Sequence, residues 1–100
     1  MQERRAARRV RANINVRWET LRTQGRGAVC DLSSSGCFVL AGGEVTPSEL
    51  ARIELALTDQ VTIFWGTVVY TVSEMGFAVR FVFGSDADKE SLERVIQTAS

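Results

Sequence analysis

Two groups of polar side chains in this sequence could bind an anionic ligand. The first lies near the N-terminus, where Arg4, Arg5, Arg8 and Arg9 form two pairs separated by two alanines. Guanidinium groups bind phosphate oxygens in a bidentate manner and match the O6 and N7 acceptors of a guanine edge in the same way. Taken alone, such a charge run is equally typical of a solvated surface or a general nucleic-acid tail.

The second group is the segment 31–36, which reads Asp-Leu-Ser-Ser-Ser-Gly. The carboxylate of Asp31 can accept hydrogen bonds from the N1 and N2 donors that guanine presents on one edge. The Ser33 hydroxyl and a close backbone approach at Gly36 would complete a small pocket. Aspartate, serine and glycine are also the residues that turns prefer, so an isolated D-x-S-x-x-G pattern favours a plain surface turn.

The charges of the chain are unevenly distributed. Lysine and arginine number 12, and aspartate and glutamate also number 12, so the formal net charge is zero. Residues 1–26 nevertheless hold eight arginines against two glutamates, a net charge of +6, whereas the remaining residues hold four cations against ten acids, a net charge of −6. We therefore expect a basic N-terminus on an acidic body, which makes a long nucleic acid a poor partner.

No catalytic or metal site is predicted. The chain contains no histidine, which removes the usual general base near neutral pH and the commonest metal ligand. Cys30 and Cys37 cannot assemble a four-ligand metal site by themselves. A disulfide between them is conceivable across a hairpin but is the less favoured alternative, since sparse cysteines are typical of a reducing cytosol.

The length of 100 residues and the hydrophobic content of 45% predict one globular domain over residues 1–100. The arginine-rich start has no apolar segment behind it, so no signal peptide is expected, and no apolar run is long enough to insert into a membrane. These features predict a cytoplasmic protein.

Six segments have the alternation, or the β-branched and aromatic content, that is typical of strands. In sequence order they are 13–19, 28–30, 37–41, 51–58, 61–72 and 77–83. The second is expected to follow a turn at Gly25 and Gly27 and to stop at Asp31. A helix over 48–57 competes with the fourth strand because of its good helix formers, but the alternation favours a strand.

Gly66 is expected to mark a bend or bulge in the long fifth strand. The tight connection at 73–76 and the alternating residues after it predict a hairpin. After these strands the period changes, because Ser85 can cap a helix whose apolar residues recur at helical spacing. Six strands and one closing helix predict a mainly β protein, a small six-stranded antiparallel barrel over 13–84 with a C-terminal α-helix over 85–98, preceded by a flexible arginine-rich arm over 1–12.

The two polar groups together change the interpretation. An R-x-x-x-R element just before the first strand, followed about 20 residues later by D-x-S-x-x-G, resembles the PilZ domain, a bacterial receptor module for cyclic di-GMP. The matching residues are Arg5 and Arg9 for the first motif, and Asp31, Ser33 and Gly36 for the second. The resemblance covers nearly the whole chain, and a six-stranded barrel is the fold of that family.

The resemblance implies a role for each matching residue. Arg5 and Arg9 would hold phosphates and guanine Hoogsteen edges, Asp31 and Ser33 the Watson–Crick side of a guanine, and Gly36 would admit the ligand to the backbone. Arg4 would stack on a base or bind a second ligand molecule. Arg4 and Arg8 also fit R-x-x-x-R, but the apolar residue that follows Arg9 favours the first register.

Other residues are weaker candidates. Arg8 and Arg80 would lie at the rim of the site. Trp18, Trp65 and Tyr70 could form a stacking platform, but their strand spacing favours core or half-buried positions.

The resemblance implies a bacterial, non-catalytic receptor that needs no cofactor. Its ligand would be cyclic di-GMP, and binding would order the arm and change a surface that a downstream protein partner reads. Two alternatives stay open, namely a PilZ-fold adaptor that binds proteins and no nucleotide, and a small barrel that binds single-stranded nucleic acid.

Overall fold

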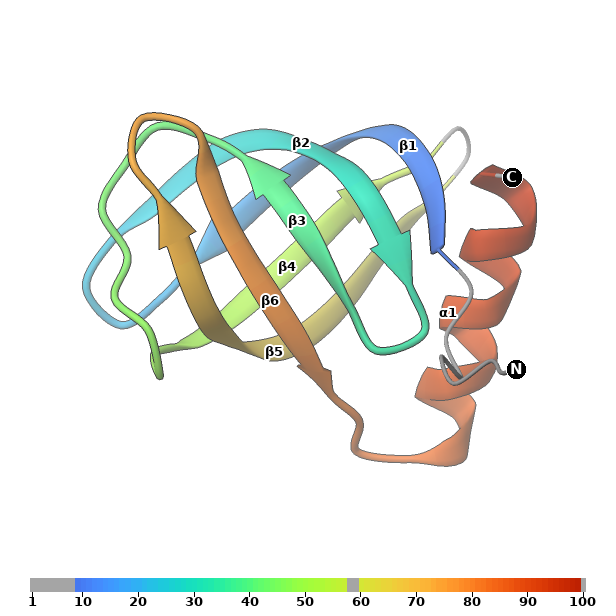
Figure 1. The fold of residues 1–100 in the computed structure, drawn as a ribbon. Helices are drawn as coiled ribbons and strands as arrows, with labels where there is room; N and C mark the ends of the chain where they lie inside the picture. Colours follow the sequence, from blue (N-terminus) through green and yellow to red (C-terminus); the bar gives the residue numbers. More distant parts are fainter. Residues whose placement is uncertain (1–8, 58–59, 100) are drawn as a thin grey trace, which may run out of the picture.

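The barrel and helix expected from the sequence are both present in the computed structural model, which describes residues 9–57 and 60–99 (Figure 1). The strands are β1 (Arg9–Glu19), β2 (Gln24–Ser33), β3 (Gly36–Leu40), β4 (Leu50–Ala56), β5 (Val61–Val72) and β6 (Gly76–Val82), and the helix is α1 (Asp86–Ala99). No helix among these residues is long and apolar enough to cross a membrane.

All neighbouring strands are antiparallel, in the closed order β1-β2-β3-β6-β5-β4. Four of the pairs are sequential neighbours, and pairing of β3 with β6 and of β1 with β4 closes the barrel. The segment 48–57 contains the strand β4 and no helix, because every residue of β4 has a partner on β5 and its alternate residues point inward. The predicted fold class is therefore confirmed.

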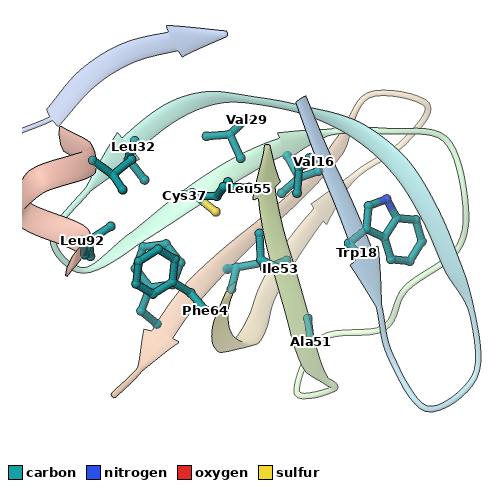
Figure 2. Close-up of a cluster of buried hydrophobic side chains, with 14 of the residues drawn as sticks. Val16, Trp18, Val29, Leu32, Cys37, Ala51, Ile53, Leu55, Phe64 and Leu92 are labelled. Carbon is teal, nitrogen blue, oxygen red and sulfur yellow. The ribbon is translucent and has the colours of Figure 1, made fainter. Parts of the chain in front are cut away.

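The core fills the barrel and continues to the helix at one end (Figure 2). Trp18 is 2% exposed and packs edge-on against Phe77, with ring centroids 5.2 Å apart, so its predicted core position is confirmed. At the other end, the core cluster includes Leu32 of β2 and Leu92 of α1. Each large side chain buried in this way contributes about 1.5–3 kcal/mol to folding.

The helix begins where its capping residues predict. The Ser85 hydroxyl accepts a hydrogen bond from the Asp88 amide at 3.3 Å, and the Asp88 carboxylate accepts one from the Gly84 amide at 3.1 Å. Both bonds satisfy amide donors near the start of the helix, where a carboxylate also interacts favourably with the helix dipole. The buried face of α1 consists of Leu92, Val95 and Ile96.

Two strand boundaries differ from the sequence prediction. β1 begins at Arg9, so residues 9–12 belong to the barrel and not to an arm. β2 runs from Gln24 to Ser33, so the predicted turn at Gly25 and Gly27 and the predicted strand end at Asp31 are both wrong. The glycines are in the strand for packing, because they lie opposite the buried Trp18 and Val16, and an added Cβ would meet the Trp18 ring at Gly25 and the Leu40 carbonyl at Gly27. Asp31 is in the strand because its side chain is partly exposed, and exposed strand positions tolerate charged residues.

The actual β1–β2 turn is Thr20–Thr23. The Thr20 amide donates to the Thr23 carbonyl at 2.8 Å, and the Thr20 hydroxyl accepts from the amides of Arg22 and Thr23 at 3.2 Å. A side-chain hydroxyl thus closes the turn without glycine.

The predicted bulge at Gly66 is also wrong, because Gly66 lies in an unbroken pairing with Ala51 on one side and Phe81 on the other. The register of β5 shifts between Val68 and Tyr70 instead. Glycine is required at position 66 for packing, because an added Cβ would overlap the Val79 side chain.

The two cysteines are free thiols. Cys37 pairs with Leu32 across β2–β3 and is buried, whereas Cys30 lies at a register shift in β2 and is partly exposed. Burial, together with the nearby Cys30 and Asp31, raises the pKa of Cys37 from 9.0 to about 12. The higher pKa in the folded state makes folding stability depend on pH. Its contribution to the free energy of unfolding is complete below about pH 9, and it is lost as the pH rises towards 12, because the Cys37 thiol of the unfolded chain ionises first.

We expect Gly36→Ala to destabilise the barrel. Gly36 lies opposite Arg80 in the β3–β6 pair, and an added Cβ would overlap the carbonyl oxygen of Val79. The two strands must separate locally, which we expect to cost about 1–3 kcal/mol in denaturant unfolding. Gly42→Ala is the matched control, because its Cβ would have no atom within 4 Å. Equal midpoints for the two variants would contradict this role of Gly36.

We expect one reactive thiol per native chain at pH 8. Cys30 is partly exposed and should react with a thiol reagent, whereas Cys37 is buried and stays protonated. The Cys30→Ser variant should then show no rapid labelling until denaturant is added, and Cys37→Ser should label as the wild type does. Rapid labelling of both thiols in the native chain would contradict the burial of Cys37.

Candidate functional site

A groove of about 580 Å³ lies on the outer surface of the barrel, across β2, β3, β6 and β5. It brings together six candidate site residues from the sequence, namely Arg9, Asp31, Ser33, Gly36, Tyr70 and Arg80. The other lining residues are Cys30, Ser35, Cys37, Phe38, Val69, Val72, Met75, Ala78 and Val79. Arg4, Arg5 and Arg8 lie outside the described residues.

The pairing register explains why these side chains meet. Asp31 of β2 pairs with Phe38 of β3, Phe38 pairs with Ala78 of β6, and Ala78 pairs with Tyr70 of β5. Paired residues point to the same face of a sheet, so these four form one row across the barrel surface. Gly36 and Arg80 form the next pair of β3 and β6 on the same face, two residues from Phe38 and Ala78. The Arg80 side chain therefore lies beside the row of four residues.

Among the groove residues that the structure describes, one ion pair forms, between Arg9 and Asp31. Their side chains lie on adjacent strands, with Nη2 of Arg9 3.9 Å from Oδ2 of Asp31, and the two side chains are 71% and 41% exposed. An exposed pair at this distance contributes at most about 1 kcal/mol. Both groups can therefore exchange this contact for a ligand at little cost.

Ser33 is buried, and its hydroxyl is occupied by the β2–β3 turn. The hydroxyl accepts from the amides of Ser35 and Gly36 at 3.2 and 3.3 Å and lies 3.1 Å from the Ser35 hydroxyl. A hydroxyl has two acceptor positions and one donor, so these contacts use its capacity. For Ser33, the interpretation of D-x-S-x-x-G as a turn is therefore confirmed. The predicted contact between its side chain and a ligand stays a prediction.

Gly36 also has a role inside the barrel. Its missing side chain lets β3 approach the Val79 carbonyl of β6, as described above. The Ser35 carbonyl accepts a hydrogen bond from the Phe81 amide at 2.8 Å, which ties the same turn to β6. The D-x-S-x-x-G motif thus fixes the turn that forms one wall of the groove, while its aspartate points to the outer surface.

Two aromatic residues of the groove stand out. The ring centroids of Phe38 and Tyr70 are 6.3 Å apart with planes tilted by 39°, and Tyr70 is 52% exposed. Phe38 is not among the residues predicted from the sequence, and Tyr70 is expected from its strand spacing in a core or half-buried position. Outward spacing within each strand was the available signal, but Phe38 of β3 and Tyr70 of β5 lie on either side of β6, so the pair is identified only once the register of all three strands is known. Trp65, the third aromatic candidate, does not line the groove.

Arg11 is a second missed residue, since it pairs with Asp31 across β1–β2 and extends the row by one strand. The row therefore has a cation and a carboxylate at one end and aromatic rings at the other. Such a surface suits a ligand that carries both a planar ring and an anionic group. In the described part of the chain, no cluster of three carboxylate or thiol side chains could hold a metal ion.

Several solved structures share the fold of this chain at low sequence identity. The PilZ domain of CeSA from a cellulose-synthesizing bacterium has a TM-score of 0.77 and 17% identity, over 91% of this chain and 96% of that chain. The PilZ domain of YcgR from Escherichia coli, solved with c-di-GMP, has a TM-score of 0.78 and 18% identity, over 97% and 92%.

A third structure, the MrkH–c-di-GMP complex of K. pneumonia, has a TM-score of 0.75 and 16% identity, and the match covers 97% of this chain but 52% of the MrkH chain. Among curated protein sequences, none matches this chain. The family model described as PilZ domain matches residues 3–98, which is nearly the whole chain. The chain therefore belongs to the PilZ domain family.

Proposed function

We propose that this protein is a non-catalytic receptor for cyclic di-GMP and that the dinucleotide binds in the groove on β2, β3, β5 and β6. The observation that carries the proposal is the placement of Arg9 and Asp31 in the same groove as the exposed Tyr70 ring. A guanine dinucleotide can make three kinds of contact here. Its phosphates can bind a cation, its guanine N1 and N2 donors can bind a carboxylate, and its bases can stack on a ring.

The comparisons support this ligand. Two structures of the same fold, YcgR and MrkH, were solved with c-di-GMP. The local chemistry agrees, because Asp31 accepts hydrogen bonds only and guanine is the base that offers two donors on one edge. A guanine ligand is thus favoured over an adenine or pyrimidine ligand.

The arginine-rich N-terminus would supply further phosphate contacts. Arg5 precedes Arg9 by four residues, and four residues span at most about 14 Å, so a ligand in the groove lies within reach of the Arg5 side chain. The positive charge is concentrated in residues 1–26, while the rest of the chain is acidic. A compact dinucleotide can contact the basic segment alone, whereas a long nucleic acid would also meet the acidic body.

Signalling would follow from ordering of the N-terminal segment on the ligand. A segment that folds onto a bound dinucleotide changes the barrel surface around the groove, and a downstream protein in the cytoplasm would recognise the new surface. The extent of this switch is limited by the difference between the ligand's affinities for the two states of the segment.

Titration calorimetry tests the ligand. We expect saturable heat with cyclic di-GMP at micromolar protein, much weaker binding of GTP, and no binding of a short oligonucleotide at physiological salt. Binding of the oligonucleotide with a steep salt dependence would instead support a single-stranded nucleic-acid protein. The absence of heat with all three ligands would support an adaptor that binds only proteins.

Substitutions in the groove test the site. We expect Arg9→Ala to abolish measurable binding and to change stability by less than about 0.5 kcal/mol, because the side chain is exposed. Asp31→Ala should weaken binding by about 1–3 kcal/mol if its carboxylate pairs with guanine. Arg26→Ala is the control for charge, because Arg26 is exposed and lies outside the groove.

The Asp31 variant separates two interpretations of the motif. An affinity equal to that of the wild type would show that Asp31 serves only the strand. An equal loss of affinity in Arg26→Ala and Arg9→Ala would show that the general positive charge, and not the groove, attracts the dinucleotide.

A further inference from the structure

Asp31 faces the outer surface because of an irregularity in β2. Val29, two residues earlier, is fully buried, so a regular strand would turn the Asp31 side chain into the core as well. The pairing with β3 shifts register between Val29 and Asp31, and the pairing with β1 shifts between Arg11 and Ile14. These irregularities turn the Asp31 carboxylate outward, where it lies opposite Arg11.

Two arginines of β1 flank this carboxylate. Arg11 is its direct neighbour, because Arg11 pairs with Asp31 across β1–β2. Arg9 pairs with Ser33 and is a diagonal neighbour, yet its Nη2 is the group that lies 3.9 Å from Oδ2 of Asp31. The partner of Asp31 on β3 is Phe38, which carries no charge. In the described parts of the two adjacent strands, the charged groups that face Asp31 are therefore these two guanidinium groups.

Binding of a guanine dinucleotide would change the contacts of the carboxylate. Arg9 would leave Asp31 to bind a phosphate, and the ion pair between them would be lost. A carboxylate has about four acceptor positions on its two oxygens, and the N1 and N2 donors of a guanine occupy one position on each oxygen. The remaining positions stay open for a donor of the protein.

Arg11 is the cation best placed to fill an open position. In the described part of the chain its guanidinium forms no ion pair, so it can bind Asp31 without giving up such a contact. Arg80, the other cation of the groove, lies two strands from Asp31, beyond β3. Unlike charges that lie directly opposite each other also stabilise an antiparallel pair of strands.

We propose that Arg11 is a positioning residue for Asp31, which it binds when Arg9 turns to a ligand phosphate. The inference rests on the proposed binding of cyclic di-GMP. Arg11 holds the carboxylate in one orientation, so that both oxygens accept from one guanine edge at the same time. It thereby sets the selectivity for guanine, because a carboxylate that rotates freely gains less from a second donor.

Calorimetry with two dinucleotides tests this role. Cyclic di-IMP is the probe, because its hypoxanthine bases keep the N1 donor and lack the N2 amino group of guanine. We expect the wild type to bind cyclic di-GMP about tenfold more tightly than cyclic di-IMP, as the loss of one hydrogen bond to a charged group predicts. Arg11→Ala should weaken cyclic di-GMP about tenfold and cyclic di-IMP only about threefold, so the ratio of the two affinities falls to about threefold.

Two variants serve as controls. Arg11→Lys keeps a charged donor opposite Asp31 and should retain most of the selectivity. Arg17→Ala removes another outward-facing arginine of β1, which lies outside the groove, and should leave both affinities unchanged. Circular dichroism of Arg11→Ala should match that of the wild type, because the Arg11 side chain is exposed.

A double-mutant cycle shows whether Arg11 acts through Asp31. In the Asp31→Ala background, Arg11→Ala should cause no further loss of affinity, because the carboxylate that Arg11 positions is absent. An undiminished loss in that background would overturn the positioning role. An equal loss for both dinucleotides in the single variant would overturn it too, because it would show that Arg11 binds a phosphate that the two ligands share.

The wild type separates this inference from the proposed function. If the wild type binds neither dinucleotide, the proposed function fails and the role of Arg11 fails with it. If the wild type binds cyclic di-GMP and Arg11→Ala keeps the same selectivity, the receptor function stands and only the positioning role fails.

Discussion

Closure of the barrel determines where every functional side chain of this protein lies. Six strands pair in a ring, so a residue on one strand has a defined partner on each neighbour. Inward positions are filled by the core, and only outward positions remain for a ligand or partner. Asp31, Phe38 and Tyr70 are far apart in the sequence and share one groove because the register of three strand pairs aligns them.

The same constraint explains why a polar motif can serve the fold and the site together. In the turn from β2 to β3, the Ser33 hydroxyl binds two backbone amides and Gly36 allows the close approach of β6. These contacts hold the strand end that carries Asp31. Within the D-x-S-x-x-G pattern, the serine and the glycine shape the turn, whereas the aspartate side chain is partly exposed on the surface.

Much of the fold follows from local sequence pattern, whereas the site needs register. Alternation at Val16 and Trp18 predicts a buried strand face, and Ser85 predicts the helix start, because both signals act within a few residues. The predicted end of β2 at Asp31 is wrong because aspartate is a residue that turns prefer, whereas Asp31 is paired on both sides, with Arg11 of β1 and Phe38 of β3. The contribution of Phe38 to the groove depends on pairings of β3 with two other strands, which composition does not encode.

The position of Arg80 shows how closely the fold and the groove depend on each other. Arg80 pairs with Gly36 of β3 and with Thr67 of β5, and its exposed side chain lines the groove. The β3–β6 pair can close at this point because Gly36 has no side chain to meet the Val79 carbonyl. The glycine that shapes the β2–β3 turn therefore also determines where a cation of the groove lies, and a change of register at this turn would move both.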